Sequence, residues 1–394
     1  MPHLTILPPS IVYILRGTRQ FFRYRHHLVF CWTLVLILVC PGKATLCNLA
    51  RLGPRHICEW HLRRFLYASY WCVRLVLWWF VDAVLAVLPP PEDGVVSAIV
   101  DKTVKDKTAT HHPFTKTGRI RTNGPYLFGM QVLFLILHWG NYRIPIDFEI
   151  VRKTEAKGYR SPNALLRTML CRFRRPAWAT KVVVLADAEF PSKETLTLIK
   201  KRGYFFVMSL PRTWKFADER ALSDLVKHLP RSCYRKTWIT RSDGRRRVYW
   251  VFLKHACLRH VGDVTIVLSK QRRNDGPSAT LIIVTNLPHV TSREVVALYT
   301  RRWTVELFIK EVKGVVGLGH AQVTKDPKRV ERSVALSLMA YLLLIKLRAK
   351  DIPEHGPWSA FALKRNFAWE VARQQLEHSF SLRLRKHRRM REAA

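Results

Sequence analysis

An ordered series of apolar segments between residues 95 and 210 constrains the fold of this chain more than any other feature. Three extended runs come first, and the third alternates between apolar and polar residues after a Gly140-Asn141 turn, as half-buried strands do. A helix, a strand, a second helix and a second strand follow. In chain order the segments are VVSAIV, YLFGMQVLFLILHW, YRIPIDFEIV, SPNALLRTMLCRF, KVVVLA, SKETLTLIKKR and YFFVMSL. This order, β-β-β-α-β-α-β, predicts an α/β domain that begins with a three-stranded meander.

Changes in composition divide the rest of the chain around this domain. Residues 1–88 have mixed helical periodicity, and the sequence LPPPEDG from Leu88 to Gly94 breaks it. We therefore predict a helical N-terminal domain at residues 1–88, and its charge and position predict that it binds DNA. Residues 211–280 contain short strand patterns joined by turn sequences, which predict a β-rich basic insertion. The α/β domain is therefore expected to occupy residues 95–210 and 281–350, and residues 351–394 form a basic C-terminal segment.

The charge of the chain indicates its class of partner. It has 67 Lys and Arg against 28 Asp and Glu, a net charge of +39 over 394 residues. A globular protein of this charge needs a polyanion as a regular partner, and nucleic acid is the first candidate. An anionic membrane surface is the second. The uncharged run from Leu28 to Cys40 has only 13 residues, fewer than the roughly 20 that span a bilayer, and fits a buried helix or strand better. We therefore expect no membrane partner.

The eight cysteines are dispersed along the chain without any C-x-x-C pair. This pattern argues against both a zinc site and a disulfide framework. It predicts a location in a reducing cytoplasm.

Aromatic and basic residues are interleaved in the predicted insertion. From Arg231 to Asp275 there are 12 Lys or Arg against three Asp and no Glu, together with Tyr234, Trp238, Tyr249, Trp250 and Phe252. A strand platform of this composition suits a phosphate backbone. An ordinary antiparallel sheet with basic outward positions explains the pattern equally well. The C-terminal segment offers a second phosphate-binding candidate, because six of the nine residues from Arg383 to Arg391 are Lys or Arg.

The stretch LYTRRWTVELFIKEVKG, Leu298 to Gly314, predicts one amphipathic helix. At about 100° per residue, five side chains fall within an arc of roughly 80°. These are Tyr299, Arg302, Glu306, Lys310 and Lys313. Apolar residues fill the neighbouring stripe. The polar face is either a solvated surface with an i,i+4 pair of Glu306 and Lys310, or a binding face.

Acidic residues are scarce, so the positions of three of them are informative. Asp101 and Asp187 each end an apolar strand, and Glu306 lies on the amphipathic helix. Brought together, three carboxylates make an oxygen-rich site for Mg²⁺, and two such ions can support in-line phosphoryl transfer. An Asp at the end of a strand is more often a turn or helix cap than a metal ligand, so each aspartate alone is weak evidence.

These residues carry a family resemblance. The helix resembles the Y-x2-R-x3-E-x6-K signature of insertion-sequence DDE transposases of the IS-four-like group, at Tyr299, Arg302, Glu306 and Lys313, and Trp303 and Lys310 are also in keeping with it. AIVDKT resembles the first-aspartate motif and VVVLADAEF the second-aspartate strand. The likeness covers roughly residues 95 to 345.

The resemblance implies an RNase H-like catalytic domain, with a mixed five-stranded sheet and flanking helices, that carries an insertion between the second Asp and the Glu. It implies cleavage of the terminal inverted repeats of an insertion sequence and joining of the 3′-hydroxyl ends to target DNA. Asp101, Asp187 and Glu306 would be catalytic and metal-binding, with two Mg²⁺ ions for which Mn²⁺ may substitute. The DNA-binding residues would be Tyr299, Arg302, Trp303, Lys310 and Lys313. The partners would be transposon-end and target DNA, bound by a homodimer, in a bacterial cytoplasm.

Several points stay open from the sequence. A second DKT begins at Asp106, and only its distance from the apolar run favours Asp101. Glu189 stands where a small residue is usual in the family, and the pair His111-His112 either orients substrate phosphates or lies in a surface loop. The alternative function is a catalytically inactive RNase H-like DNA-binding protein derived from a transposase. An RNase H-like nuclease without strand transfer is a third reading, and a membrane-surface protein a fourth.

Overall fold

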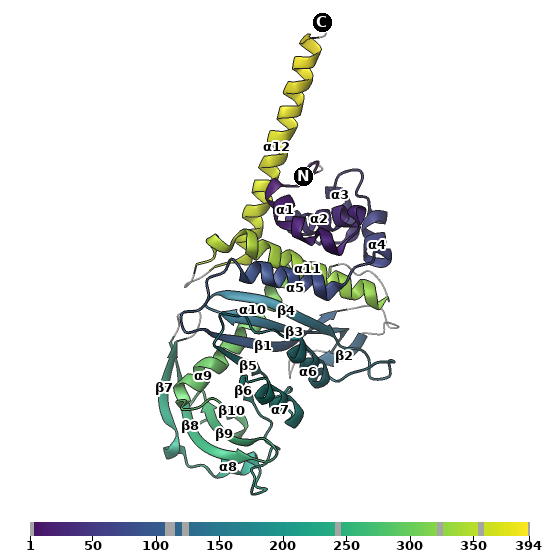
Figure 1. Cartoon of the computed structure of the whole chain (residues 1–394). Coiled ribbons are helices and arrows are strands. Elements are labelled where there is room, and N and C mark those ends of the chain that lie inside the picture. The colour runs from purple at the N-terminus through teal and green to yellow at the C-terminus, as the bar shows by residue number, and fades with distance from the viewer. Residues whose placement is uncertain are drawn as a thin grey trace. The chain divides into compact units, whose positions relative to one another are not determined.

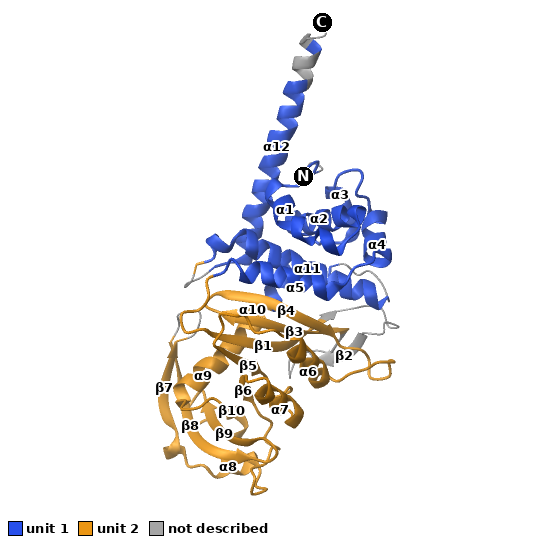
Figure 2. Ribbon diagram, in the orientation of Figure 1, with its two compact units in different colours: residues 1–88, 309–352, 358–394 blue, residues 89–308, 353–357 orange. Residues whose placement is uncertain are grey.

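The computed structural model describes residues 4–106, 115–119, 126–240, 246–320, 326–353 and 358–392. The chain forms two compact units, which Figure 2 shows in different colours. Unit 1 comprises residues 1–88, 309–352 and 358–394, and unit 2 comprises residues 89–308 and 353–357.

Unit 2 is built on a mixed sheet (Figure 1). In the described part of the chain the sheet has ten strands in the order β2-β3-β1-β5-β6-β10-β9-β8-β7, with β4 paired to β3. The strands are β1 (Val95–Asp106), β2 (Thr115–Arg119), β3 (Tyr126–Trp139), β4 (Tyr142–Ile150), β5 (Lys181–Ala186), β6 (Phe205–Ser209), β7 (Arg235–Thr240), β8 (Arg246–Leu258), β9 (Gly262–Lys270) and β10 (Leu281–Thr285). Strands β1, β5 and β6 run parallel to one another, and the other pairings are antiparallel.

The predicted meander is confirmed, because β3 pairs antiparallel with both β1 and β4. All residues of β3 from Met130 to Trp139 are buried, which explains why this strand reads as a continuous apolar run without alternation. The mixed α/β class with flanking helices is also confirmed. The sheet is larger than the five strands expected, because β2 and the strands of the basic segment pair onto it, with β9 joining β10.

Five helices begin in unit 2. They are α6 (Pro162–Arg172), α7 (Lys193–Lys201), α8 (Leu222–His228), α9 (Ser292–Thr300) and α10 (Thr304–Gly314), and a 3-10 turn (η4, Arg301–Trp303) joins the last two. Side chains fix three of the starts: Ser161 caps α6, Ser192 caps α7, and Thr291 forms a capping box with Glu294 at α9. A buried ion pair fastens α6 to the sheet, since Arg172 Nη2 lies 2.6 Å from Asp147 Oδ2 on β4.

Unit 1 is helical, which confirms the helical N-terminal region. Its elements are α1 (Pro9–Leu15), η1 (Arg16–Phe21), α2 (Tyr24–Val39), α3 (Leu46–Leu52), α4 (Glu59–Ala68), α5 (Val73–Leu85), α11 (Pro327–Leu347), η5 (Ala349–Asp351) and α12 (Ala360–Glu392). Every residue of α2 from Val29 to Val39 is buried, so the uncharged run forms a buried helix. Helix α11 packs against α2, α4 and α5. The basic C-terminal segment forms the long helix α12 rather than an extended arm.

No single helix in the described ranges is long and apolar enough to cross a membrane. By length and composition alone, the pair α4 and α5 passes the same test together, with a bend of 104° between the two helices.

Candidate active site

Asp101 and Asp187 lie at the same level on neighbouring parallel strands. Residues Val95 to Ile99 of β1 pair one by one with Lys181 to Leu185 of β5, an offset of 86 residues. The same offset separates Asp101 from Asp187, so continuing the register sets the two carboxylates side by side. This register also favours Asp101 over Asp106, which lies five residues further along β1.

The Asp101 carboxyl is largely buried and carries a perturbed pKa. Its Oδ1 accepts a hydrogen bond of 2.7 Å from the Lys102 backbone N–H, and Arg302 Nη1 lies 3.4 Å from its Oδ2. Burial raises the pKa of Asp101 to about 6, and the charges of Asp187 and Glu306 add to the rise. The N–H donor and the guanidinium act in the opposite direction and do not cancel it. The carboxylates are therefore close enough to repel one another.

Asp187 is held by two donors on the sheet edge. The backbone N–H of Ala188 donates to its Oδ1 at 2.7 Å, and the Ser209 hydroxyl donates to the same oxygen at 3.1 Å. Ser209 is the last residue of β6 and is buried, so it acts as a rigid orienting group. Tyr299 is buried close to Asp187, and burial raises the pKa of Tyr299.

The predicted single helix from Leu298 to Gly314 is wrong in one respect that shapes the site. Helix α9 ends at Thr300, and the 3-10 turn precedes α10. The five polar side chains also differ in exposure, which the sequence did not indicate. Tyr299 and Arg302 are buried, at 6% and 7% exposure, whereas Glu306 is exposed. The turn directs the first two side chains into the unit, toward the aspartates.

Arg302 is the cation of this cluster. Its guanidinium carbon lies 5.8 Å from the ring centre of Tyr299 and 5.3 Å from that of Trp303. Burial lowers the pKa of Arg302, but the nearby acidic groups outweigh that effect and the pKa is raised overall. Within the described residues its Nε is buried and has no hydrogen-bond partner. The guanidinium therefore retains a free donor next to the carboxylates.

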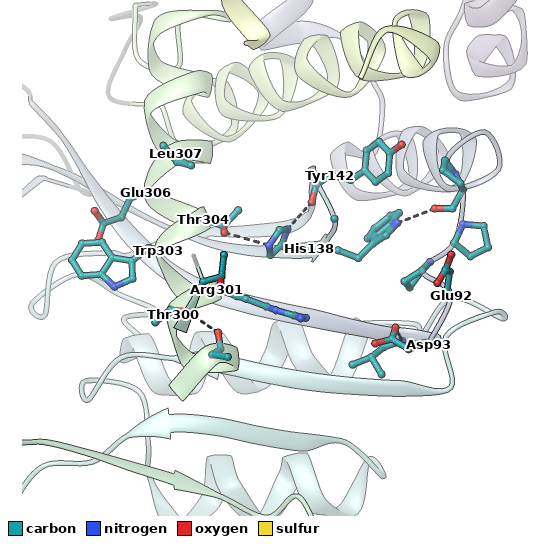
Figure 3. A pocket seen from close by; sticks show the side chains of 18 residues that line it. Glu92, Asp93, His138, Tyr142, Thr300, Arg301, Trp303, Thr304, Glu306 and Leu307 are labelled. Atoms are coloured by element: carbon teal, nitrogen blue, oxygen red, sulfur yellow. Dashed lines mark hydrogen bonds between the residues drawn. The ribbon is translucent and has the colours of Figure 1, made fainter. Parts of the chain in front are cut away.

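Glu306 lies in the first turn of α10, beside a pocket of about 760 Å³ within unit 2. The pocket is lined by the segment before β1, the β3–β4 turn and the α9–α10 junction. Figure 3 shows Glu306 and Trp303 together on one side of α10, while Arg301 extends toward Asp93. Trp303 is 51% exposed, so a large aromatic surface adjoins the carboxylates.

His138 is a site residue that the sequence did not single out. It is buried at the end of β3, where Nδ1 lies 3.0 Å from the Tyr142 carbonyl oxygen and Nε2 3.3 Å from the Thr304 hydroxyl (Figure 3). Because a carbonyl can only accept, Nδ1 carries the proton and Nε2 accepts from Thr304. Burial lowers the pKa of His138 to about 4. The only sequence signal was one histidine inside an apolar strand.

The other predicted residues have different surroundings. Lys310 and Lys313 lie on the part of α10 that belongs to unit 1, where Lys310 is exposed and burial lowers the pKa of the half-buried Lys313. Glu189 forms an ion pair with Lys102. His111 and His112 lie outside the described residues.

The donor set at Asp101, Asp187 and Glu306 consists of carboxylate oxygens, which hard divalent cations such as Mg²⁺ prefer. Over the described ranges, however, no three His, Cys, Asp or Glu side chains are close enough together to hold a metal ion as they stand. The raised pKa of Asp101, which burial causes first, indicates that its negative charge is poorly solvated. The residues present thus fit a cation by their chemistry.

Comparison with known proteins places this geometry in a family. Residues 107–343, more than half of the chain, match the family described as Transposase DDE domain. The match contains Asp187 and Glu306 and begins six residues after Asp101. No curated protein sequence matches the chain.

Comparison with solved structures gives one named structure whose likeness bears on the fold. The piggyBac transposase synaptic complex with hairpin DNA has a TM-score of 0.52 at 10% identity, over 95% of this chain and 82% of that one. The NurA nuclease from Sulfolobus solfataricus covers 69% of this chain and 90% of its own at 8% identity, and its TM-score of 0.24 is too low to bear on the fold. The family match carries the assignment: the chain belongs to the transposase DDE domain family of DNA transposases.

Proposed function

We propose that this transposase cleaves the terminal inverted repeats of an insertion sequence and joins the resulting 3′-hydroxyl ends to target DNA. The observation that carries the proposal is the register of β1 and β5, which sets Asp101 level with Asp187. Asp101 also forms an ion pair with Arg302. Two carboxylates carried by adjacent interior strands of the sheet, with Glu306 adding to their field, are an arrangement suited to metal-dependent phosphoryl transfer.

Asp101, Asp187 and Glu306 would hold the divalent cation, Mg²⁺ or Mn²⁺. When bound, two such ions activate the attacking oxygen and stabilise the leaving oxygen of an in-line displacement. The chain's own donors orient the ligands: the Lys102 N–H fixes Asp101, and the Ala188 N–H and Ser209 hydroxyl fix Asp187. Such fixed donors reduce the reorganisation required during reaction.

Arg302 has a second role in this proposal. Its positive charge and its position beside the carboxylates suit it to a DNA phosphate next to the scissile bond. The exposed Trp303, on the turn between α9 and α10, would contribute a further DNA contact, whereas the buried Tyr299 would support Arg302. Lys310 and Lys313, on the part of α10 that belongs to unit 1, would contact phosphates. We also propose a homodimer on paired DNA ends, as expected for an enzyme that must cut both ends of an element. The piggyBac structure is itself described as a synaptic complex.

Cleavage of a labelled duplex that carries the end repeats tests the proposal. Wild type is compared with Asp101→Asn, Asp187→Asn and Glu306→Gln in Mg²⁺, Mn²⁺ or EDTA. Glu189→Gln is the matched control, because it removes the same charge two residues from Asp187. We expect metal-dependent cutting at the repeat boundary that the three variants lose and the control keeps, with DNA binding retained throughout.

The same experiment decides against the alternative of a catalytically inactive DNA-binding protein. Binding without cutting in either metal, unchanged by the substitutions, would establish that alternative. Loss of cutting in Glu189→Gln as well would require a different set of metal-binding carboxylates.

A further inference from the structure

One face of helix α4 in unit 1 carries arginine and aromatic side chains in place of an ordinary polar surface. The exposed residues are Trp60, Arg63, Arg64 and Tyr67, at the i, i+3, i+4, i+7 spacing of a single helix face. Trp60 and Tyr67 are each 56% exposed. Large exposed aromatic side chains grouped on one face mark a binding surface more often than a solvated one. We call these four residues the α4 face.

The opposite side of α4 is anchored in the core of unit 1. Leu62, Phe65 and Leu66 are almost fully buried, and the ring of Phe65 stacks on Trp71 with centroids 5.6 Å apart. The preceding helix α3 packs against α4, and both contact α2. The face is thus supported by a short three-helix arrangement.

A buried arginine fixes the end of this helix. Arg332 of α11 donates to the carbonyl oxygens of Leu66 at 2.8 Å, Tyr67 at 3.3 Å and Ser69 at 2.6 Å. These are carbonyls that a helix end otherwise leaves without partners. The bonds hold the last turn in place, so the α4 face is rigid before any partner binds. Preorganisation of this kind lowers the entropy cost of binding.

An arginine side chain lies over each of the two aromatic rings of the α4 face. The Arg64 guanidinium carbon lies 5.0 Å from the ring centre of Trp60, and that of Arg329 on α11 lies 4.2 Å from the ring centre of Tyr67. Arg63 Nε donates to Glu59 Oε1 at 2.7 Å, an exposed pair that adds little stability. Arginine in this setting presents a flat fork of donors, which suits paired acceptors on bases and phosphates.

We propose that α4 is the helix that reads the base sequence of the transposon end in the major groove of duplex DNA. The inference rests on the proposed function, because that function supplies the ligand, which is transposon-end DNA. A helix of ten residues is about 15 Å long and an α-helix fits the major groove, which is about 12 Å wide. Arg63 and Arg64 would contact guanine edges, and Trp60 and Tyr67 would pack on the thymine methyl groups or sugars.

The test selects duplexes with a randomised core using the full chain, and then measures discrimination between the selected sequence and a scrambled one. Arg63→Gln and Arg64→Gln are expected to reduce this discrimination by about 5- to 150-fold each, the range for loss of a bidentate base contact. Arg63→Lys keeps the charge but not the fork, so it should retain affinity for scrambled DNA and still lose discrimination.

Arg373→Gln is the matched control. Arg373 lies on α12, where its Nε is 3.7 Å from Glu377 Oε1 in an exposed i,i+4 pair, so the substitution removes the same charge as Arg63→Gln from an exposed helix surface, although its pair is looser than that of Arg63 with Glu59. It should leave discrimination unchanged. Equal melting midpoints for Arg63→Gln and Arg373→Gln show that the fold is intact. Trp60→Ala supplies a further variant of the α4 face that alters no charge.

The inference is overturned if the wild-type chain selects no sequence, or if the α4 variants discriminate as well as wild type. Its failure is separable from that of the proposed function. Sequence-selective binding that depends on α4, without cleavage in Mg²⁺ or Mn²⁺, would remove the cleavage proposal and support the role of α4. Cleavage at a specific sequence that the α4 variants still recognise would support the cleavage proposal and remove the role of α4.

Discussion

Arg302 Nη1 lies 3.4 Å from Asp101 Oδ2. Among the described residues, Arg302 is the one cationic side chain that forms an ion pair with Asp101, the first carboxylate of the candidate site. Both side chains are largely buried, with 9% and 19% of their surfaces exposed. The pair does not offset the cost of burying the Asp101 charge, because the pKa of Asp101 remains raised to about 6. Without metal, the site is therefore a source of instability that Arg302 limits.

Arg302→Gln should destabilise the metal-free protein. Removing one partner of a buried ion pair costs about 3 to 5 kcal/mol, and we expect the low end because Asp101 keeps some contact with solvent. Mg²⁺ should reduce the difference from wild type, since a bound cation would replace the lost charge. Urea unfolding in EDTA and in Mg²⁺ measures both effects. The exposed neighbour Arg301→Gln is the control, and equal stability of the two variants in EDTA would remove Arg302 from this role.

Asp101→Asn should stabilise the metal-free protein above pH 6. Folding raises the pKa of this carboxyl from 3.8 to about 6, so the folded state binds the proton more tightly than the unfolded state does. The resulting penalty is absent below pH 3.8 and complete above pH 6, where it amounts to at most about 3 kcal/mol. This gain already includes the attraction of Arg302, which lowers the pKa of Asp101.

Urea unfolding in EDTA at pH 4 and pH 7.5 tests this expectation for Asp101→Asn, with Glu189→Gln as the control. The gain in the free energy of unfolding should be larger at pH 7.5 than at pH 4. A gain of the same size at both pH values would mean that the Asp101 charge is not its source.

His138 should make stability depend on pH in a different window. Folding lowers its pKa from 6.5 to about 4, so the unfolded state gains a proton first as the pH falls. The stability from the neutral ring is complete above pH 6.5 and is lost between pH 6.5 and pH 4, by about 3 kcal/mol. His138→Gln removes this dependence, whereas His228→Gln on α8 should keep it. Parallel stability curves for wild type and His138→Gln would contradict the assignment.

The two strands that carry the aspartates could be predicted from sequence because each apolar run is a local pattern, whereas their register joins segments 86 residues apart and was not predicted. The apolar runs before Asp101 and Asp187 form β1 and β5, and equal spacing from the start of each strand sets the two aspartates level. The pairing of β9 with β10 could not be predicted, since it joins segments whose contact depends on the rest of the sheet.

The break between α9 and α10 was missed for a geometric reason. Apolar residues continue at helical spacing through Arg301 to Trp303, so periodicity shows no interruption. A 3-10 turn advances about 120° per residue instead of 100°, and three residues therefore shift the helix face by roughly 60°. That shift separates the buried Tyr299 and Arg302 from the exposed Glu306. His138 was missed because its partner Thr304 is distant in the sequence.

Lys310→Gln should weaken binding to any DNA duplex and reduce the slope of log affinity against log salt by about one unit, since each phosphate contact releases about one counterion. Lys310 is exposed on α10, one helical turn after Glu306. A DNA strand that binds at Glu306 and runs along α10 would therefore pass within reach of the Lys310 side chain. Lys313 is half-buried, and burial lowers its pKa, so its substitution should affect the slope less than that of Lys310. Titrations of a fluorescent duplex between low and moderate salt give the slopes, with the exposed Lys350→Gln as the control. Identical slopes for Lys310→Gln and the control would return Lys310 to an ordinary solvated surface, and a larger loss for Lys313 would show that the half-buried ammonium reaches the phosphate.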